Sequence, residues 1–218
     1  MATSTVLLIH GLAASPVVFW RLARTLRSAG KEVVFHRYPS CWKSIDEHVD
    51  DLQRHVNSIL QTQNDSLSII GHSLGGILAA EMLARSELSG ISQFISIASP
   101  HRGSHVARWM SQQRVFRWCT PLVELAENQD GLNLLSNRQT RVRSVEELNL
   151  AASQICNLSA NKDRVIRPGN AIMNDVIHHA VTPGGHIDTL FFHETQQQVL
   201  RFLNHGTLRS DAYPNAVV

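Results

Sequence analysis

Residues 71–75 read Gly-His-Ser-Leu-Gly and place Ser73 between two glycines, and a further glycine follows at position 76. The apolar residues 67–70 before this segment predict a buried strand, and the alanine- and leucine-rich residues 74–85 after it predict a helix. A serine on so tight a strand-to-helix turn has its hydroxyl lifted above the sheet, where it can act as a nucleophile. The glycines leave the space that this turn needs. The turn also places the Leu74 N–H at a helix start, where it can face a developing oxyanion.

A plain glycine-rich junction is the alternative interpretation of this segment, because short patterns of this kind also arise by chance. A phosphate-binding loop fits less well, since no lysine follows the last glycine. The strand before the serine and the helix after it favour the interpretation of Ser73 as a nucleophile.

Apolar runs alternate with amphipathic stretches along most of the chain, which predicts a doubly wound, mostly parallel α/β sheet of about six strands flanked by helices. The predicted strands are residues 5–10, 32–36, 67–70, 91–98, 154–158 and 175–181. The predicted helices are residues 16–29, 45–60, 74–85 and 189–203. Ser15 and Ser44 are candidate N-caps of the first two helices, and Gly30 is expected to end the first.

The alternation breaks between residues 105 and 150, where short helices are predicted because Pro121 and Gly131 interrupt the apolar pattern. A chain of 218 residues is long enough for one domain with a substantial core, so we expect a single domain over 1–218. The polar residues 206–218 are expected to form a loosely ordered tail.

Charge and cysteine content exclude some classes of function. The formal net charge is +2 and no dense run of Lys and Arg occurs, so nucleic-acid binding is not expected. Cys41, Cys119 and Cys156 are widely spaced and form no Cys-x-x-Cys pair, which fits a reducing compartment. One disulfide with one free thiol is the alternative interpretation.

The N-terminal residues lead straight into the apolar run 6–9, which is too short for a signal peptide or a membrane helix and follows no basic region. We therefore expect a cytoplasmic protein without an integral membrane segment, with a secreted form as the alternative.

Two further motifs carry a resemblance to a known family. Residues 10–12, His-Gly-Leu, follow the first predicted strand and resemble the HG motif of the oxyanion loop in lipases and esterases. Residues 99–104, Ser-Pro-His-Arg-Gly-Ser, resemble the loop after the next strand beyond the nucleophile in bacterial lipases. With the Ser73 segment, these motifs make the chain resemble the α/β-hydrolase superfamily and, within it, the lipase-like branch. Only residues 105–150 are unmatched.

The resemblance implies a catalytic triad in the chain order serine, acid, histidine. Asp163 lies in a polar turn after the predicted strand 154–158 and resembles the acid of this family, although a solvated turn aspartate is the alternative. Asp175 is the second choice, but it opens the next predicted strand. His186 follows a Pro-Gly-Gly loop and matches the family's histidine, so we expect Ser73, Asp163 and His186 to be catalytic.

Other histidines have simpler interpretations. His178 and His179 lie within a predicted strand and His193 within the closing helix, so structural or surface roles are expected. In the family, histidines at the positions of His10 and His72 support the oxyanion loop and the nucleophile turn. No His-Glu-x-x-His pattern and no close Cys/His set occurs, and we expect no metal site and no cofactor.

The resemblance also implies an oxyanion hole formed by the backbone N–H groups of Leu12 and Leu74. It identifies residues 105–150 as a helical cap or lid that selects the substrate. The large apolar side chains of this insertion are candidates for substrate binding, unless they only pack the insertion onto the core. They are Trp109, Met110, Phe116 and Trp118.

Taken together, the motifs predict a serine hydrolase, an esterase or lipase that forms an acyl-enzyme on Ser73. A small-molecule or lipid ester is the expected substrate, and the expected state is a monomer or weak oligomer. A thioesterase or a protein or lipid deacylase with the same triad is one alternative. A hydrolase-fold binding protein without turnover is the other.

Overall fold

Six parallel strands form one open sheet, with the spatial order β2-β1-β3-β4-β5-β6. The structure is a computed structural model that describes residues 4–62, 66–102, 119–124 and 144–209. Within them the strands are β1 (Thr5–Ile9), β2 (Glu32–His36), β3 (Leu67–His72), β4 (Ile91–Ile97), β5 (Ile155–Ala160) and β6 (His178–Thr182).

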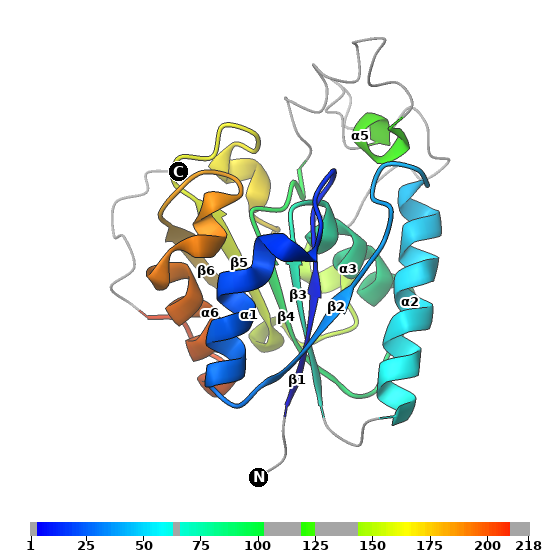
Figure 1. The fold of residues 1–218 in the computed structure, drawn as a ribbon, viewed down its shortest axis with the longest axis horizontal. Coiled ribbons are helices and arrows are strands. Elements are labelled where there is room, and N and C mark those ends of the chain that lie inside the picture. The colour runs from blue at the N-terminus through cyan, green and yellow to red at the C-terminus, as the bar shows by residue number, and fades with distance from the viewer. Residues whose placement is uncertain (1–3, 63–65, 103–118, 125–143, 210–218) are drawn as a thin grey trace.

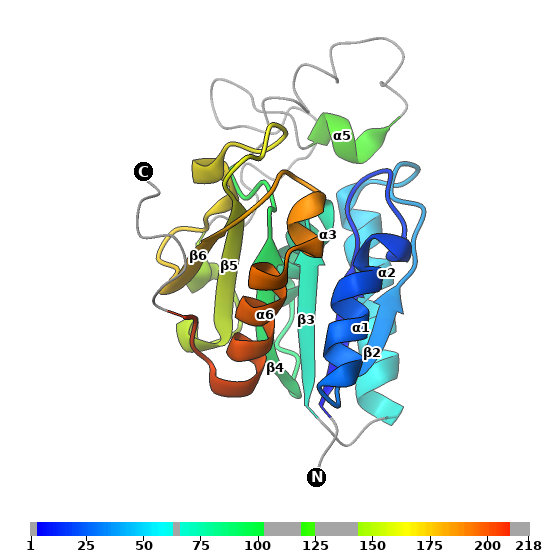
Figure 2. The same ribbon diagram turned by 60° about the vertical axis from the view of Figure 1, so that its left-hand side comes forward.

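Helices cover both faces of this sheet (Figures 1 and 2). The longer ones are α1 (Trp20–Ser28), α2 (Ile45–Thr62), α3 (Leu74–Arg85) and α6 (His193–His205), and α5 (Thr120–Glu124) is short. Short 3-10 helices are η1 (Pro16–Phe19), η3 (Val145–Glu147), η4 (Ala152–Gln154), η5 (Pro168–Ala171) and η6 (Asp188–Phe191). One hydrophobic cluster packs α2 and α3 on one face, and a second packs α1 and α6 on the other. This arrangement confirms the predicted doubly wound parallel sheet.

The predicted elements are found, with differences at their ends. The bounds of β2 and α3 agree with the prediction, whereas β3 runs on to His72. The prediction that the last strand begins at Asp175 is wrong, since β6 begins at His178. Asp175 instead has a left-handed φ of 61° and its carboxylate accepts a hydrogen bond from the Ser144 hydroxyl. The predicted helix 16–29 begins as the 3-10 helix η1.

Local capping explains where α2 begins and where α1 ends. Ser44 forms a capping box with Glu47: the Ser44 hydroxyl accepts from the Glu47 N–H, and the Glu47 carboxylate accepts from the Ser44 N–H. Ser15 has extended backbone before η1, but its side chain makes no capping hydrogen bond. Gly30 follows α1 with a φ of 78°, a conformation that glycine adopts without strain.

Because all six strands are parallel, their carboxyl ends lie at one edge of the sheet. The loops after β1, β3, β4, β5 and β6 therefore meet there, and each contains one of the motifs singled out in the sequence. None of the helices that the structure describes combines the length and hydrophobicity needed to cross a bilayer.

A substitution at Gly75 tests the close packing of α3 on β1. A Cβ at this position would collide with the backbone carbonyl of Ile9, whereas nothing lies within 4 Å of a Cβ at Gly169. We expect Gly75→Ala to destabilise the protein by about 1–3 kcal/mol or more, since backbone cannot yield as a side chain does. Gly169→Ala is the matched control and should melt like wild type. Equal melting temperatures for both variants in thermal unfolding would contradict this packing.

Candidate active site

Ser73 lies on a strained turn between β3 and α3. Its φ of 55° and ψ of −122° are unusual for a residue with a side chain, and strain of this kind is common at functional sites. A Cβ at Gly71 would lie 2.5 Å from the Gly76 Cα, and a Cβ at Gly76 would collide with the Ser99 hydroxyl. The glycine spacing in the sequence thus reflects close packing around the turn.

Three of the predicted residues meet at this turn. The Ser73 Oγ lies 2.9 Å from the His186 Nε2, and the His186 Nδ1 lies 2.8 Å from an Asp163 carboxylate oxygen. Because a carboxylate accepts, His186 donates through Nδ1 and its Nε2 is left to accept from the Ser73 hydroxyl. The Asp163 side chain is 2% exposed and that of His186 is 15% exposed.

Asp163 is held as an ionised acceptor. Its other carboxylate oxygen accepts from the Val165 and Ile166 N–H groups, both at 2.8 Å. Burial alone would raise the pKa of Asp163, but hydrogen bonds from His186 and from the two amides outweigh it and hold the pKa below its usual value. Asp175, the second choice from the sequence, is exposed and bonded elsewhere.

His72 contacts the loop after β6 that carries His186, residues 183–187, which we call the histidine loop. The sequence does not predict this contact. Its Nε2–H donates to the main-chain carbonyl of His186 over 2.7 Å, and the two rings are 5.1 Å apart. Burial lowers the pKa of His72 to about 3, so the ring is neutral at pH 7. His72 therefore fixes the backbone of His186 without placing a positive charge beside it.

The loop after β1 comes close to Ser73. A Cβ at Gly11 would lie 2.9 Å from the Ser73 Cβ, so this approach requires glycine. The Tyr38 hydroxyl donates to the His10 carbonyl over 2.6 Å. Further along the same loop, the Ala13 N–H donates to the Ser40 hydroxyl over 2.9 Å. Ala13 itself has a left-handed φ of 51°. The segment after β2 therefore holds the loop that contains Leu12.

Residues after β4 support the nucleophile turn from the other side. Ala98 has a left-handed φ of 49°, which turns the chain so that Ser99 packs against Gly76. The His101 ring is hydrogen-bonded through Nε2 to the Ser96 hydroxyl over 2.7 Å. Burial lowers the pKa of His101 to about 3, so this ring is also neutral at pH 7.

The remaining histidines singled out in the sequence bond elsewhere. His179 is hydrogen-bonded to the Ser159 hydroxyl over 3.0 Å. His178 packs its ring edge-on against Phe202 at 5.3 Å between centroids. His193 is exposed at the start of α6.

The four predicted substrate-binding residues lie outside the described residues. They are Trp109, Met110, Phe116 and Trp118. Parts of the insertion that the structure does describe are fixed to the core: the Glu124 carboxylate in α5 accepts from the Ile45 N–H over 2.8 Å, and Cys119 and Leu122 are buried.

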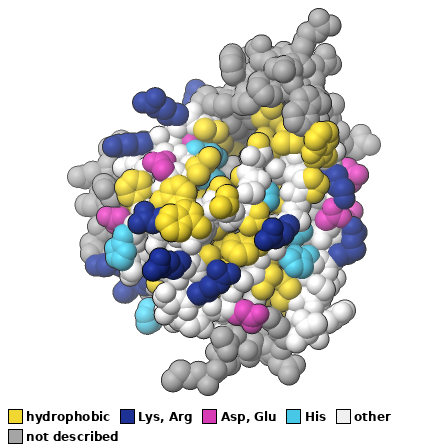
Figure 3. All heavy atoms as spheres, viewed as in Figure 1, with side chains coloured by type: hydrophobic (Ala, Val, Ile, Leu, Met, Phe, Trp, Pro, Cys, Tyr) yellow, Lys and Arg dark blue, Asp and Glu magenta, His cyan; other side chains and the backbone are white. Residues whose placement is uncertain are grey.

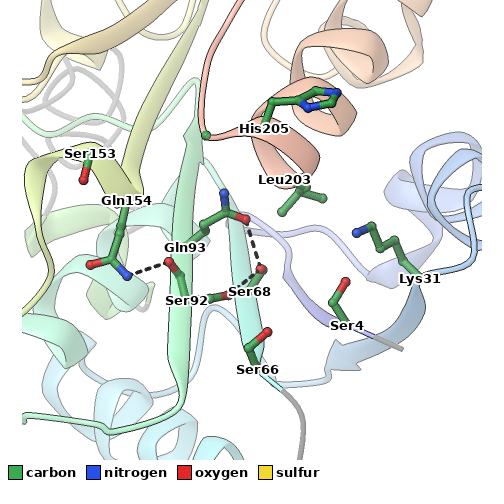
Figure 4. Close-up of a pocket in the computed structure, with 11 residues that line it drawn as sticks. Ser4, Lys31, Ser66, Ser68, Ser92, Gln93, Ser153, Gln154, Leu203 and His205 are labelled. Carbon is green, nitrogen blue, oxygen red and sulfur yellow. Dashed lines mark hydrogen bonds between the residues drawn. The ribbon is translucent and has the colours of Figure 1, made fainter. Parts of the chain in front are cut away.

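A pocket of roughly 530 Å³ lies at the opposite end of the sheet (Figure 4). The amino ends of β1, β3 and β4 and the end of α6 contribute to its walls, together with Gln154, which donates to the Ser92 carbonyl. It takes no part in the Ser73 site. Among the described residues, no group of three His, Cys, Asp or Glu side chains is arranged to hold a metal ion.

Comparison with known proteins places the chain in a family. A family model for the α/β hydrolase fold matches residues 4–158. The chain belongs to the α/β hydrolase family. No curated protein sequence matches it.

Several solved structures share this α/β hydrolase fold. The mature Bacillus licheniformis lipase BlEst2 has a TM-score of 0.68 at 14% identity, over 95% of this chain and 93% of the lipase. The Legionella pneumophila phospholipase PlaB has a TM-score of 0.71 at 15% identity, over 94% of this chain and 59% of the phospholipase. The type II thioesterase BorB from the borrelidin biosynthetic cluster has a TM-score of 0.60 at 18% identity, over 95% of this chain and 93% of the thioesterase. At such identities the likeness extends to the fold alone.

The buried neutral histidines predict loss of stability in acid. Unfolded His101 takes up a proton below about pH 6.5, but the folded ring does so only near pH 3. Because the unfolded state then binds more protons, the free energy of unfolding should fall as the pH drops from 6.5 towards 3. The slope is about 1.4 kcal/mol per pH unit for each such histidine.

Urea unfolding at pH 7 and pH 5 measures this effect in His101→Gln, which should lose less stability between the two pH values than wild type does. His193→Gln is the matched control, because its side chain is exposed. An identical loss in wild type and His101→Gln would show that His101 does not resist protonation in the folded state.

Proposed function

We propose that this α/β hydrolase is a carboxylic ester hydrolase, an esterase or lipase, that forms an acyl-enzyme on Ser73. The observation that carries the proposal is the continuous hydrogen-bond chain from Ser73 through His186 to Asp163, with distances of 2.9 and 2.8 Å. A serine hydroxyl needs such a base to become nucleophilic, and the base needs such an acid to hold its tautomer.

Each side chain then has one task. His186 takes the Ser73 proton through Nε2 as the hydroxyl attacks the ester carbonyl, and returns it to the departing alcohol. Asp163 stabilises the imidazolium that forms. Water, activated by the same histidine, attacks the acyl-enzyme and releases the acid.

The backbone N–H groups of Leu12 and Leu74 are the proposed oxyanion donors. Leu74 opens α3, where unpaired N–H groups and the helix dipole favour negative charge. The loop that contains Leu12 approaches Ser73 at Gly11. Removal of one such donor typically costs about 3–4 kcal/mol of transition-state stabilisation.

We assign substrate selection to residues 105–150, as a helical cap on a single domain. The proposed acyl-chain contacts are Trp109, Met110, Phe116 and Trp118. A thioester substrate is the second candidate, and a type II thioesterase is among the proteins that share this fold. The same triad would serve, because only the leaving group differs.

Loss of Ser73 tests the reaction. We expect Ser73→Ala to lower kcat/KM for p-nitrophenyl butyrate by about 10⁴-fold or more, since the nucleophile is gone. A fluorophosphonate probe should label wild type, fail to label Ser73→Ala, and label His186→Ala slowly. Ser153→Ala, at an exposed serine distant from the site, is the matched control and should behave as wild type.

Full ester hydrolysis by Ser73→Ala would refute the proposed reaction. Failure of wild type to label would favour a binding protein without turnover. Oxygen and sulfur esters of matched acyl chain length, assayed side by side, separate an esterase from a thioesterase.

Ser40→Ala and Tyr38→Phe test the support of the oxyanion loop. Each removes one hydrogen bond that holds residues 10–13. We expect kcat to fall about 10-fold with little change in KM, because the oxyanion contact strengthens only in the transition state. Steady-state kinetics on the same ester measure kcat and KM separately. A rise in KM at constant kcat would assign these residues to substrate binding instead.

A further inference from the structure

Exposed apolar side chains gather beside the histidine loop. Four large apolar side chains of the described residues are exposed beside this loop. Their exposed fractions are 69% for Val17, 55% for Trp20, 47% for Ile187 and 38% for Phe192. With the half-buried Phe191, we call these five residues the apolar face. Ile187 directly follows His186 in the chain, so the apolar face begins at the candidate active site.

The apolar face is continuous although its residues come from distant segments. The rings of Trp20 and Phe191 are 6.5 Å apart, which joins the start of α1 to η6. The Phe192 ring packs over Gly184, in the loop that carries His186. Figure 3 shows apolar side chains lying together on this side of the molecule, with Lys and Arg side chains around them.

Positive charge borders the apolar face. The Arg21 guanidinium lies 5.6 Å from the Trp20 ring centroid, and Arg24 is exposed on the next turn of α1. Lys162 is exposed beside the histidine loop, where its N–H donates to the Gly184 carbonyl.

Acidic side chains near the apolar face are Asp188 and Glu194. The Asp188 carboxylate accepts from the Gly185 N–H over 2.7 Å, and Glu194 lies in the first turn of α6, where the helix dipole favours it. Asp188 is thus bonded to local backbone, and the exposed cations Arg21, Arg24 and Lys162 outnumber the two acids among the described residues near the apolar face.

We propose that the apolar face docks on the surface of an anionic lipid aggregate and presents lipid esters to Ser73; the second part rests on the proposed ester hydrolase function. Tryptophan and phenylalanine with arginine at their edge are the side chains that favour the boundary between headgroups and acyl chains. Anionic headgroups attract the bordering cations. Since Ile187 directly follows His186 in the chain, a lipid that leaves such a surface starts close to the proposed base.

Vesicle flotation tests the docking, with Ser73→Ala as the background so that the lipid stays intact. We expect this protein to float with vesicles of equal phosphatidylglycerol and phosphatidylcholine, and much less with pure phosphatidylcholine. Adding Trp20→Ser and Ile187→Ser should lower the bound fraction about 10-fold. Ile177→Ser is the matched control: Ile177 is 61% exposed but precedes β6 at the opposite end of the sheet, and its loss should change nothing.

Charge and turnover give two independent readouts. Arg21→Gln with Arg24→Gln should weaken binding to the anionic vesicles and reduce its dependence on salt. In the active enzyme, Trp20→Ser with Ile187→Ser should slow hydrolysis of a vesicle-borne ester about 10-fold, yet leave hydrolysis of a dissolved short-chain ester unchanged.

The outcomes separate docking from catalysis. Absence of flotation, or flotation that survives loss of Trp20 and Ile187, overturns the proposal. A dimer in analytical ultracentrifugation that these two substitutions dissociate also overturns it, because a second copy would then cover the apolar face. Failure of wild type to hydrolyse the dissolved ester counts against the proposed function and leaves the flotation result standing. Thermal unfolding confirms that each variant is folded.

Discussion

The close contact between the first turn of α3 and the backbone of β1 is the constraint on which the site depends. A side chain at Gly75 would occupy the place of the Ile9 carbonyl, so α3 can approach the sheet only through glycine. This approach leaves Ser73 with a φ of 55°, a conformation that costs about 1–3 kcal/mol and persists only under surrounding contacts. The hydrogen bond from the Ser73 N–H to the Ile97 carbonyl, at 3.0 Å, and the complete burial of Leu74 supply those contacts.

Electrostatics around this turn are set by burial. His72 and His101 have pKa values lowered to about 3, so both rings are neutral at pH 7 and add no charge near His186. Asp163, by contrast, is buried with enough hydrogen-bond donors to remain ionised. Neither of these two rings therefore neutralises the negative charge beside the His186 imidazole. Such a setting stabilises an imidazolium when the histidine takes a proton.

Local signals account for what the sequence could predict. The β-α alternation is strong enough to place every strand of the described sheet, and Ser44 marks the start of α2, where the structure adds Glu47 as its capping partner. Ser73, Asp163 and His186 could be proposed as catalytic because the family resemblance implies their order and each follows a recognisable strand. Individual tertiary contacts could not: Ser40 reaches across 27 residues to Ala13, and His72, expected only to support the nucleophile turn, reaches across 114 residues to His186.

A partial signal for Ser40 was present. Once β2 is placed beside β1, the residues after β2 must lie near the loop after β1, because parallel neighbours end at the same edge of the sheet. The start of β6 was missed for a different reason. Asp175 is followed by apolar residues typical of a strand, but its left-handed backbone and its bond to Ser144 belong to a turn that no local periodicity encodes.

The proposed chemistry and the proposed docking surface lie on different parts of the fold. The triad side chains come from the loops after β3, β5 and β6, whereas the apolar face comes mainly from η1, the start of α1 and η6. The two meet only at residues 186 and 187, where the catalytic candidate is followed by an exposed isoleucine. Because helices α1 and α6 pack on a common core beneath the apolar face, that face is fixed relative to Ser73. A change in its side chains would therefore affect the proposed docking, while the hydrogen bonds that join Ser73, His186 and Asp163 stay as they are.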